Sequence, residues 1–343
     1  MKKTRLFSLL LAGLLTLSLA AGCSAGAAAG SDGTLKATAA VSETSDTAPA
    51  GTEAAATSAQ ASAEFSADTS PVETRDMAGR KIHLDKPAEK IVALTASDCE
   101  ILYAIGAGDK LVGRGEYCDY PADVTKLPSV ESGAETNIEQ IIALDPDVVV
   151  MNFMAQTKEQ VTALENAGIT VVMNNAVTID DIYTSITLLG AVTGKNTEAE
   201  SVINTMKSVF AGIGPSPETT GKTVYFEVSP LEYGLWTAGK GTFMDEIAGI
   251  LGLTNIFADV DGWGEVSQEQ VIERNPDYIV TIAMYSGQGS TPVDEIAGRD
   301  GWKNISAVKN GRIYNADSNE ISRPGPRIAD AAKALSDFVE ANG

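Results

Sequence analysis

Aromatic, amide and guanidinium side chains follow several predicted β-strands, and they are the residues of this chain best suited to hold a ligand. Aromatic rings with a polar atom suit a large planar or amphipathic molecule, and arginine suits carboxylate, catecholate or phosphate groups. In α/β proteins such side chains meet where the chain leaves the carboxyl ends of strands. The candidates are Arg114, Tyr117, Asn152 and Phe153 in the first half, and Tyr233, Trp236, Trp263, Tyr285, Asn319 and Arg323 in the second.

Sequence motifs for catalysis and for metal binding are absent from the chain. It contains no G-x-S-x-G, Walker A, dinucleotide fingerprint or HExxH, and GKGTF at 239–243 lacks the spacing of a phosphate loop. A zinc site needs three or four cysteine or histidine ligands, but His83 is the only histidine and no CxxC occurs. We therefore expect a protein that is not an enzyme and has neither a metal site nor a cofactor. An enzyme is kept as an alternative.

The first residues predict export from the cytoplasm. Lys2, Lys3 and Arg5 precede an uncharged apolar run over residues 6–21, which is typical of a signal peptide covering residues 1–22. The run closes on LAAGC, which resembles the lipobox of bacterial lipoproteins. The resemblance implies that Cys23 is lipidated, and two or more acyl chains would hold the protein stably on the outer face of the cell membrane. The alternative is an ordinary secreted protein.

Composition and charge limit the partners of the mature chain. After Cys23, the residues up to 70 are mostly Ala, Ser, Thr, Gly and Glu, which predicts a disordered tether over 23–70. The first 70 residues hold four of the 25 basic and six of the 46 acidic residues, so the remainder has a net charge of −19. Nucleic acid and anionic membranes are poor partners for such a surface. We expect membrane contact through the lipid anchor only.

Beyond residue 70, strands alternate with helices, a pattern that favours parallel sheets covered by helices. A helix is predicted over Asp98–Ile105, and the longest one over Asn196–Gly212, where apolar residues recur at helical spacing. These elements predict an N-terminal lobe over 71–190, an interlobe helix within 191–214 and a C-terminal lobe over 215–343. The strand candidates are Lys90–Leu94, Leu111–Gly113, Val148–Met151, Val171–Met173, Val224–Val228, Tyr278–Ile282 and Arg312–Tyr314.

An internal repeat supports two lobes of similar build. Residues 137–150 read NIEQIIALDPDVVV and residues 267–280 read SQEQVIERNPDYIV, with six identities at an offset of 130. Each copy predicts a capped short helix, a Pro-Asp break and a buried strand. A weaker echo pairs Glu100-Ile101 and Gly106 with Glu246-Ile247 and Gly252.

Several blocks in a fixed order resemble a known class of binding protein. It comprises the substrate-binding proteins of ATP-binding cassette importers for ferric siderophores, haem and cobalamin, and the resemblance covers about residues 72–340. It implies an α/β fold with two lobes, central mostly parallel sheets, one rigid connecting helix and a ligand cleft between the lobes. The matching blocks are Asp76–Arg80, Ile91–Leu94, Gly106–Asp109, Tyr117–Pro121, Asn137–Asp147, Trp263–Gln270 and Arg323–Ile328.

The resemblance also implies a ligand and a partner. The ligand would be a metal chelate, either a ferric siderophore or a corrinoid such as cobalamin, with haem as an alternative. Related cobalamin binders carry an aromatic residue shortly before the first repeat helix, and residues 132–135 here contain none, which weakens cobalamin. Tyr117 and Trp263 flank matching blocks and are the better ligand candidates. Glu139 and Glu269, matched in the repeat, would dock the lobes onto a permease dimer.

Four further expectations concern residues other than these ligand and docking candidates. Cys99 and Cys118 both follow neighbouring strands, so a disulfide between them is possible. Arg80 and Arg327 are expected in structural ion pairs, Trp302 in the core and His83 at the surface. A surface adhesion lipoprotein is the remaining alternative, although adhesion does not explain a duplicated lobe with aromatic residues at strand ends.

Overall fold

The computed structural model describes residues 70–133, 135–152, 158–284, 287 and 289–343. Cys23 and the expected signal peptide and tether lie outside the described residues. Within the described part, no helix is both long enough and apolar enough to cross a membrane.

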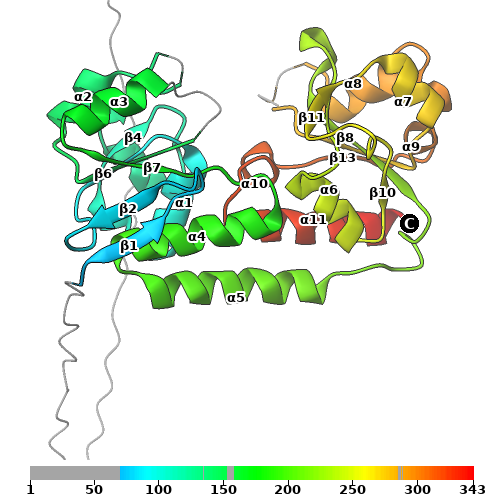
Figure 1. Cartoon of the computed structure of the whole chain (residues 1–343). Helices are drawn as coiled ribbons and strands as arrows, with labels where there is room; N and C mark the ends of the chain where they lie inside the picture. Colours follow the sequence, from blue (N-terminus) through cyan, green and yellow to red (C-terminus); the bar gives the residue numbers. More distant parts are fainter. Residues whose placement is uncertain (1–69, 134, 153–157, 285–286, 288) are drawn as a thin grey trace, which may run out of the picture. The chain divides into compact units, whose positions relative to one another are not determined.

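The N-terminal lobe is built on a sheet of five parallel strands (Figure 1). The order across this sheet is β5-β4-β3-β6-β7, and a separate antiparallel hairpin, β1-β2, precedes it in the chain. Every residue of β3 and β6 is buried, because helices cover both faces of a parallel sheet. The strands are β1 (Val72–Arg75), β2 (Lys81–Leu84), β3 (Ile91–Ala93), β4 (Leu111–Gly115), β5 (Ser129–Val130), β6 (Val148–Met151) and β7 (Thr170–Met173).

The C-terminal lobe has a sheet in the order β11-β9-β8-β12-β13, with β10 paired to β8. Its strands β8, β10, β12 and β13 are parallel to one another. At one edge of the sheet, β9 pairs antiparallel with β8 and with β11. The sheet is therefore mostly parallel, as predicted. The strands are β8 (Thr223–Ser229), β9 (Trp236–Ala238), β10 (Thr254–Asn255), β11 (Trp263–Glu265), β12 (Tyr278–Thr281) and β13 (Ile313–Asn315).

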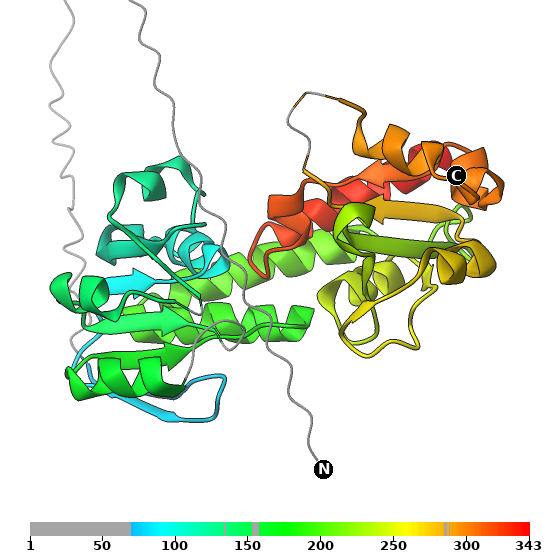
Figure 2. The ribbon, with the colours of Figure 1, turned by 90° about the horizontal axis from the view of Figure 1, so that it is seen from above.

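One long helix connects the lobes. Helix α5 spans Asn196–Gly212, the range that the apolar spacing predicted, and it packs against α4 and α11 (Figures 1 and 2). Helix α4 begins with a capping box at Thr178 and ends at Gly194, whose φ of 71° suits glycine. The helices are α1 (Ala96–Ala104), α2 (Ile138–Ala143), α3 (Lys158–Asn166), α4 (Ile179–Thr193), α5, α6 (Phe243–Ile250), α7 (Gln268–Arg274), α8 (Pro292–Gly298), α9 (Ser306–Lys309), α10 (Ser318–Ile321) and α11 (Ile328–Asn342).

The internal repeat has the same structure in both lobes. Residues 138–150 and 268–280 share one order of buried, half-buried and exposed positions, with a single difference. Among the residues that the structure describes, the non-glycine residues with positive φ are Asp145 and Asn275, at 50° and 48°, and they match at the offset of 130. Asn275 is the C-cap of α7, and Asp145 follows the C-cap of α2 by one residue. Asp and Asn are the residues best suited to positive φ after glycine. The predicted duplication is thus a duplication of backbone geometry.

The expected structural residues lie where the sequence predicted. Trp302 is fully buried against Tyr225 in the C-terminal lobe. Arg80 pairs with Asp76 and Glu165, and its Nε lies 2.8 Å from the Asp76 carboxylate. His83 is exposed on β2, and a hydrogen bond to Glu73 raises its pKa above the usual value.

Candidate ligand-binding cleft

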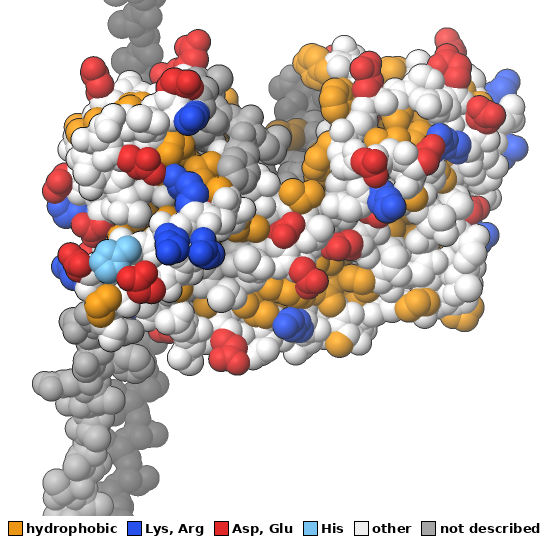
Figure 3. Space-filling model, viewed as in Figure 1, with side chains coloured by type: hydrophobic (Ala, Val, Ile, Leu, Met, Phe, Trp, Pro, Cys, Tyr) orange, Lys and Arg blue, Asp and Glu red, His pale blue; other side chains and the backbone are white. Residues whose placement is uncertain are grey.

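A polar pocket of about 230 Å³ lies where the two lobes meet. Three adjacent parallel strands of the N-terminal lobe, β3, β6 and β7, end at this pocket, as the strand-end rule requires. The C-terminal lobe contributes the segment after α10. Figure 3 shows the surface hollowed between the lobes. The lining side chains used below are Thr95, Ser97, Asn152, Asn174, Ser322 and Arg323.

A buried carboxylate lies beneath this pocket. Asp98, in the first turn of α1, accepts hydrogen bonds from Thr95 Oγ1 at 2.6 Å and from Asn174 Nδ2 at 2.5 Å. Burial raises the pKa of Asp98 to about 6, although both hydrogen bonds oppose the shift. Asn174 Nδ2 also donates to Ser185, whereas the buried Asn174 Oδ1 has no hydrogen-bond partner among the described residues. Asn174 therefore links the pocket lining to the buried Asp98 carboxylate.

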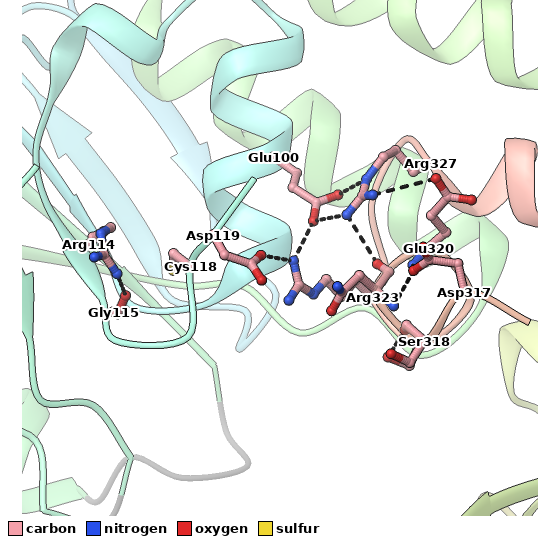
Figure 4. A network of polar contacts seen from close by, with 12 residues as sticks. Glu100, Arg114, Gly115, Cys118, Asp119, Asp317, Ser318, Glu320, Arg323 and Arg327 are labelled. Carbon is pink, nitrogen blue, oxygen red and sulfur yellow. Dashed lines mark hydrogen bonds and ion pairs between the residues drawn. The ribbon is translucent and has the colours of Figure 1, made fainter. Parts of the chain in front are cut away.

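An ion-pair network crosses from one lobe to the other beside the pocket (Figure 4). Glu100, on α1, accepts from Arg327 Nε at 2.9 Å and Nη2 at 2.7 Å, and from Arg323 Nη1 at 3.1 Å. Arg323 Nη1 also donates to Asp119 at 2.6 Å, which lowers the pKa of Asp119. The expected ion pair of Arg327 is confirmed, and its guanidinium also lies 3.9 Å from the Tyr120 ring centroid. Arg323 therefore faces the pocket with its charge already paired.

A second polar contact joins the lobes just after the pocket-lining residues 174–176. Glu246, on α6 of the C-terminal lobe, accepts a hydrogen bond from the backbone N–H of Ile179 at 2.6 Å. Nearby, the backbone N–H of Phe243 donates to Val177 O at 2.8 Å. Burial raises the pKa of Glu246, and the bond from Ile179 opposes that shift. The lobes are thus connected by charged side chains as well as by α5.

Exposed aromatic residues come from both lobes. Tyr117, after β4, and Tyr233, in a single helical turn after β8, have about three quarters of their surface exposed, 74% and 75%. Trp236 and Trp263 belong to the antiparallel strands β9 and β11, and the register pairs Trp236 with Glu265 and Trp263 with Ala238. Ala238 lies two residues after Trp236 on β9, so these two residues share a face of the sheet, and Trp263, which pairs with Ala238, lies on the same face. The Trp263 ring also meets Phe243 edge-on, with centroids 5.6 Å apart.

The remaining predicted side chains differ in their surroundings. Arg114 curls back onto its own loop, where Nη1 donates to Gly115 O and Glu116 O, each at 3.1 Å. Asn319 contributes backbone contacts, since its carbonyl accepts from Arg327 at 3.2 Å. Asn152 and Arg323 are brought together, because both line the polar pocket. Phe153 and Tyr285 lie outside the described residues.

The two cysteines of the N-terminal lobe are neighbours, but they are not bridged. Both are buried free thiols, so the disulfide considered from the sequence is not present in this structure. Each Sγ donates toward the same carbonyl, Ala93 O, at 3.8 Å from Cys99 and 3.9 Å from Cys118. The hydrogen bond with Cys118, followed by burial, raises the pKa of Cys99 well above its usual value. The pair packs as two small apolar side chains in the core.

The repeated glutamates face solvent in both lobes. Glu139 lies in the first turn of α2 and Glu269 in the first turn of α7. The pKa of Glu269 is lowered by its own backbone N–H and by the Ser267 hydroxyl. A stabilising role for Glu269 at the start of its helix is therefore visible in the structure.

Sequence reasoning missed several residues of the site. Asn174 directly follows β7, so the rule that selected Asn152 after β6 would have selected it too. Thr95 and Ser97 follow β3 and could have been found in the same way. The pairing of Arg323 with Glu100 and Asp119 spans more than 200 residues of sequence, and no local pattern indicates it.

Known proteins resemble the chain over most of its length. The family profile described as periplasmic binding protein matches residues 91–320. The uncharacterized ABC transporter substrate-binding lipoprotein YvrC of Bacillus subtilis is 34% identical over 276 residues, which cover 78% of this chain and 85% of that protein.

Two solved structures extend the comparison. A possible iron-binding periplasmic protein of Staphylococcus epidermidis is 31% identical with a TM-score of 0.62, over 74% of this chain and 99% of that one. The vitamin B12-binding protein BtuF of Vibrio cholerae is 26% identical with a TM-score of 0.60, over 75% and 98%. Profile, sequence and fold agree, and the chain belongs to the periplasmic binding protein family.

Proposed function

We propose that this protein is the extracytoplasmic solute-binding component of an ATP-binding cassette importer, anchored to the outer face of the cell membrane through lipidated Cys23. The observation that carries the proposal is the site itself. A polar pocket lies at the junction of two lobes, and exposed aromatic residues stand on loops and edge strands of both. The lipobox-like end of the predicted signal peptide and the likeness to a substrate-binding lipoprotein support the anchor.

The proposed ligand is a metal chelate, and the chemistry of the pocket favours a corrinoid. Corrinoids are large, flat molecules whose rims carry neutral amide groups, which both donate and accept hydrogen bonds. The pocket offers amides at Asn152 and Asn174 and hydroxyls at Thr95, Ser97 and Ser322. Exposed rings such as Tyr117 and Trp263 suit the flat faces of such a ligand. The likeness to a vitamin B12-binding protein agrees with this choice.

Ferric siderophores and haem remain the competing ligands. An anionic siderophore or a haem propionate binds most strongly to a guanidinium that has no other carboxylate partner. The Arg323 guanidinium already donates hydrogen bonds to Glu100 and Asp119. Haem iron takes an axial histidine or tyrosine, and His83 lies on β2 beside Glu73. The missing aromatic residue at 132–135 argues against cobalamin.

We further propose that Glu139 and Glu269 meet cationic residues on the two halves of a permease dimer. Their matched positions on α2 and α7 and their exposure support this role. The net charge of −21 disfavours binding to nucleic acid.

Thermal melting in the presence of different ligands tests the proposal. The purified full chain is heated with cyanocobalamin, dicyanocobinamide, haemin and several ferric siderophores, each at saturating concentration. A ligand at 100 times its dissociation constant stabilises the folded protein by about 2.7 kcal/mol, which raises the melting temperature measurably. We expect the corrinoids to do so. A response to siderophores or haemin alone would reject the corrinoid, and no response to any chelate would reject the metal-chelate class.

A further inference from the structure

The repeat keeps an apolar surface residue in both lobes that the fold itself does not require. Several of its other identities have a structural role in each copy. The matched prolines and valines are buried. The matched aspartates accept from backbone N–H groups where a neighbouring strand begins, Asp147 from Glu89 and Lys90 just before β3, and Asp277 from Thr223, the first residue of β8. Gln270 closes the capping box of α7. The matched isoleucines, Ile142 and Ile272, instead face solvent.

These isoleucines are unusual on this surface. They expose 42% and 37% of their area. In the part of the chain that the structure describes, the other large exposed apolar side chains are Tyr117, Tyr120, Tyr233, Trp236, Trp263 and Met284, so Ile142 and Ile272 are the aliphatic branched ones. Scattered apolar residues need no explanation, but the same residue exposed at matched positions of two lobes does.

Each isoleucine shares a helix face with a matched glutamate. Ile142 follows Glu139 by three residues on α2, and Ile272 follows Glu269 by three on α7, a spacing that makes the side chains neighbours. We call these two pairs the docking patches. In Figure 1 both α2 and α7 lie away from α5, and Figure 3 shows acidic side chains along the upper edge of both lobes in the same view.

The helices that carry the docking patches present no unpaired cation of their own. Helix α2 contains no lysine or arginine. The basic residue of α7, Arg274, is bound to both carboxylate oxygens of Asp259 and to Ile256 O, so its charge is already paired. A complementary surface would therefore place a cation beside an apolar hollow, and it would do so twice.

We propose that Ile142 and Ile272 are apolar anchors that insert into equivalent hollows on the two subunits of the importer's permease, each beside a cation that meets the neighbouring glutamate. The occupant is a partner with two copies of one surface, because two equal patches on one chain fit two equal surfaces and not a single one. Exposed charges mainly set the rate of encounter, whereas a desolvated apolar anchor slows dissociation. This inference rests on the proposed importer function.

The test measures how the full lipidated chain stimulates ATP hydrolysis. Candidate permease–ATPase complexes in liposomes are titrated with wild-type chain carrying cyanocobalamin, and the complex that responds is used throughout. The double variant Ile142→Ser, Ile272→Ser is compared with Glu139→Gln, Glu269→Gln. The matched control is the double variant Ala143→Ser, Glu273→Ser. Ala143 and Glu273 follow the two isoleucines directly on the same helices, and both are exposed, but the repeat does not match them in residue type.

We expect the isoleucine double variant to need at least ten times more protein for half-maximal stimulation, with unchanged melting temperature and unchanged cobalamin affinity. The control should stay within twofold of wild type. Stimulation by the isoleucine double variant within twofold of wild type would overturn the inference while leaving the importer function intact. If the wild-type chain stimulates no complex with cyanocobalamin, the titration is repeated with each chelate of the melting screen, and failure with all of them would overturn the importer function itself. A wild-type dimer in sedimentation that the isoleucine variant dissolves would identify a second copy as the occupant instead.

Discussion

Glu100 and Glu246 occupy equivalent positions in the two lobes, and the carboxylate of each binds a residue at the start of a helix that belongs to the other lobe. Glu100 binds Arg327, just before α11, and Glu246 binds the N–H of Ile179, the first residue of α4. Each glutamate precedes a fully buried isoleucine and a glycine with φ above 70°. The weak echo in the sequence therefore marks the residues that join the lobes.

Removing either carboxylate should weaken the interface, but by different amounts. Glu100→Ala leaves the mostly buried guanidinium groups of Arg323 and Arg327 without this partner, which typically costs about 3 kcal/mol or more. Glu246→Ala removes one backbone hydrogen bond and should cost about 1 kcal/mol. Urea unfolding followed by circular dichroism measures both free energies of unfolding. An equal or reversed ranking would show that the Glu100 network does not stabilise the folded chain.

The buried Asp98 predicts a pH-dependent stability. Its pKa is raised to about 6 in the folded protein, so the folded state holds the proton more tightly than the unfolded chain does. The resulting stabilisation is present below the unfolded pKa of about 4 and is lost as the pH rises through 6. Asp98→Asn should therefore stabilise the protein at pH 7.5, by up to about 3 kcal/mol, and have little effect near pH 4. Melting temperatures across this range provide the measurement, and a difference independent of pH would contradict the assignment.

Tyr117 and Trp263 are predicted to contact the ligand from opposite lobes. Loss of one stacked aromatic anchor typically costs 1–2 kcal/mol, or about a tenfold loss of affinity. Tyr117→Ala should weaken binding without lowering the apo melting temperature, because the side chain is 74% exposed. Trp263 also packs on Phe243, so Trp263→Phe is the safer variant and should give a smaller loss. Calorimetric titration with the chelate found in the melting screen tests both, and normal binding by either variant would assign that residue to the fold.

The thiols of Cys99 and Cys118 should be present and slow to react. Both are buried, and the pKa of Cys99 is raised, so little reactive thiolate forms at neutral pH. We expect two titratable thiols after denaturation without reductant, and a much slower reaction in the native protein. Cys23→Ala serves as the background so that no third thiol contributes. Absence of titratable thiols would instead establish the disulfide considered from the sequence.

Cys23→Ala should release the protein from membranes or leave it unprocessed, because no acyl chain can then be attached. Fractionation of cells and the mobility of the chain on gels distinguish these forms. A variant that is processed and fractionates with membranes like the wild type would point to another anchor.

Local sequence patterns were enough to predict the elements and their duplication. The range of α5 followed from apolar residues at helical spacing, and β6 from an unbroken apolar run between turn residues. Both signals come from neighbouring residues, whose spacing alone decides which face of an element is buried. The repeat at an offset of 130 predicted two similar lobes, and the matched φ angles of Asp145 and Asn275 confirm it.

The sequence by itself thus determined the α/β class, the two lobes and the strand ends at which ligand residues gather. Only the tertiary structure decided which of those residues meet. It brought Asn152 and Arg323 to one pocket, paired Arg323 with Glu100 and turned Arg114 onto its own loop. It also left Cys99 and Cys118 unbridged. The physical reason is that charge pairing and burial depend on distances between residues far apart in the chain, and spacing along the sequence does not contain those distances.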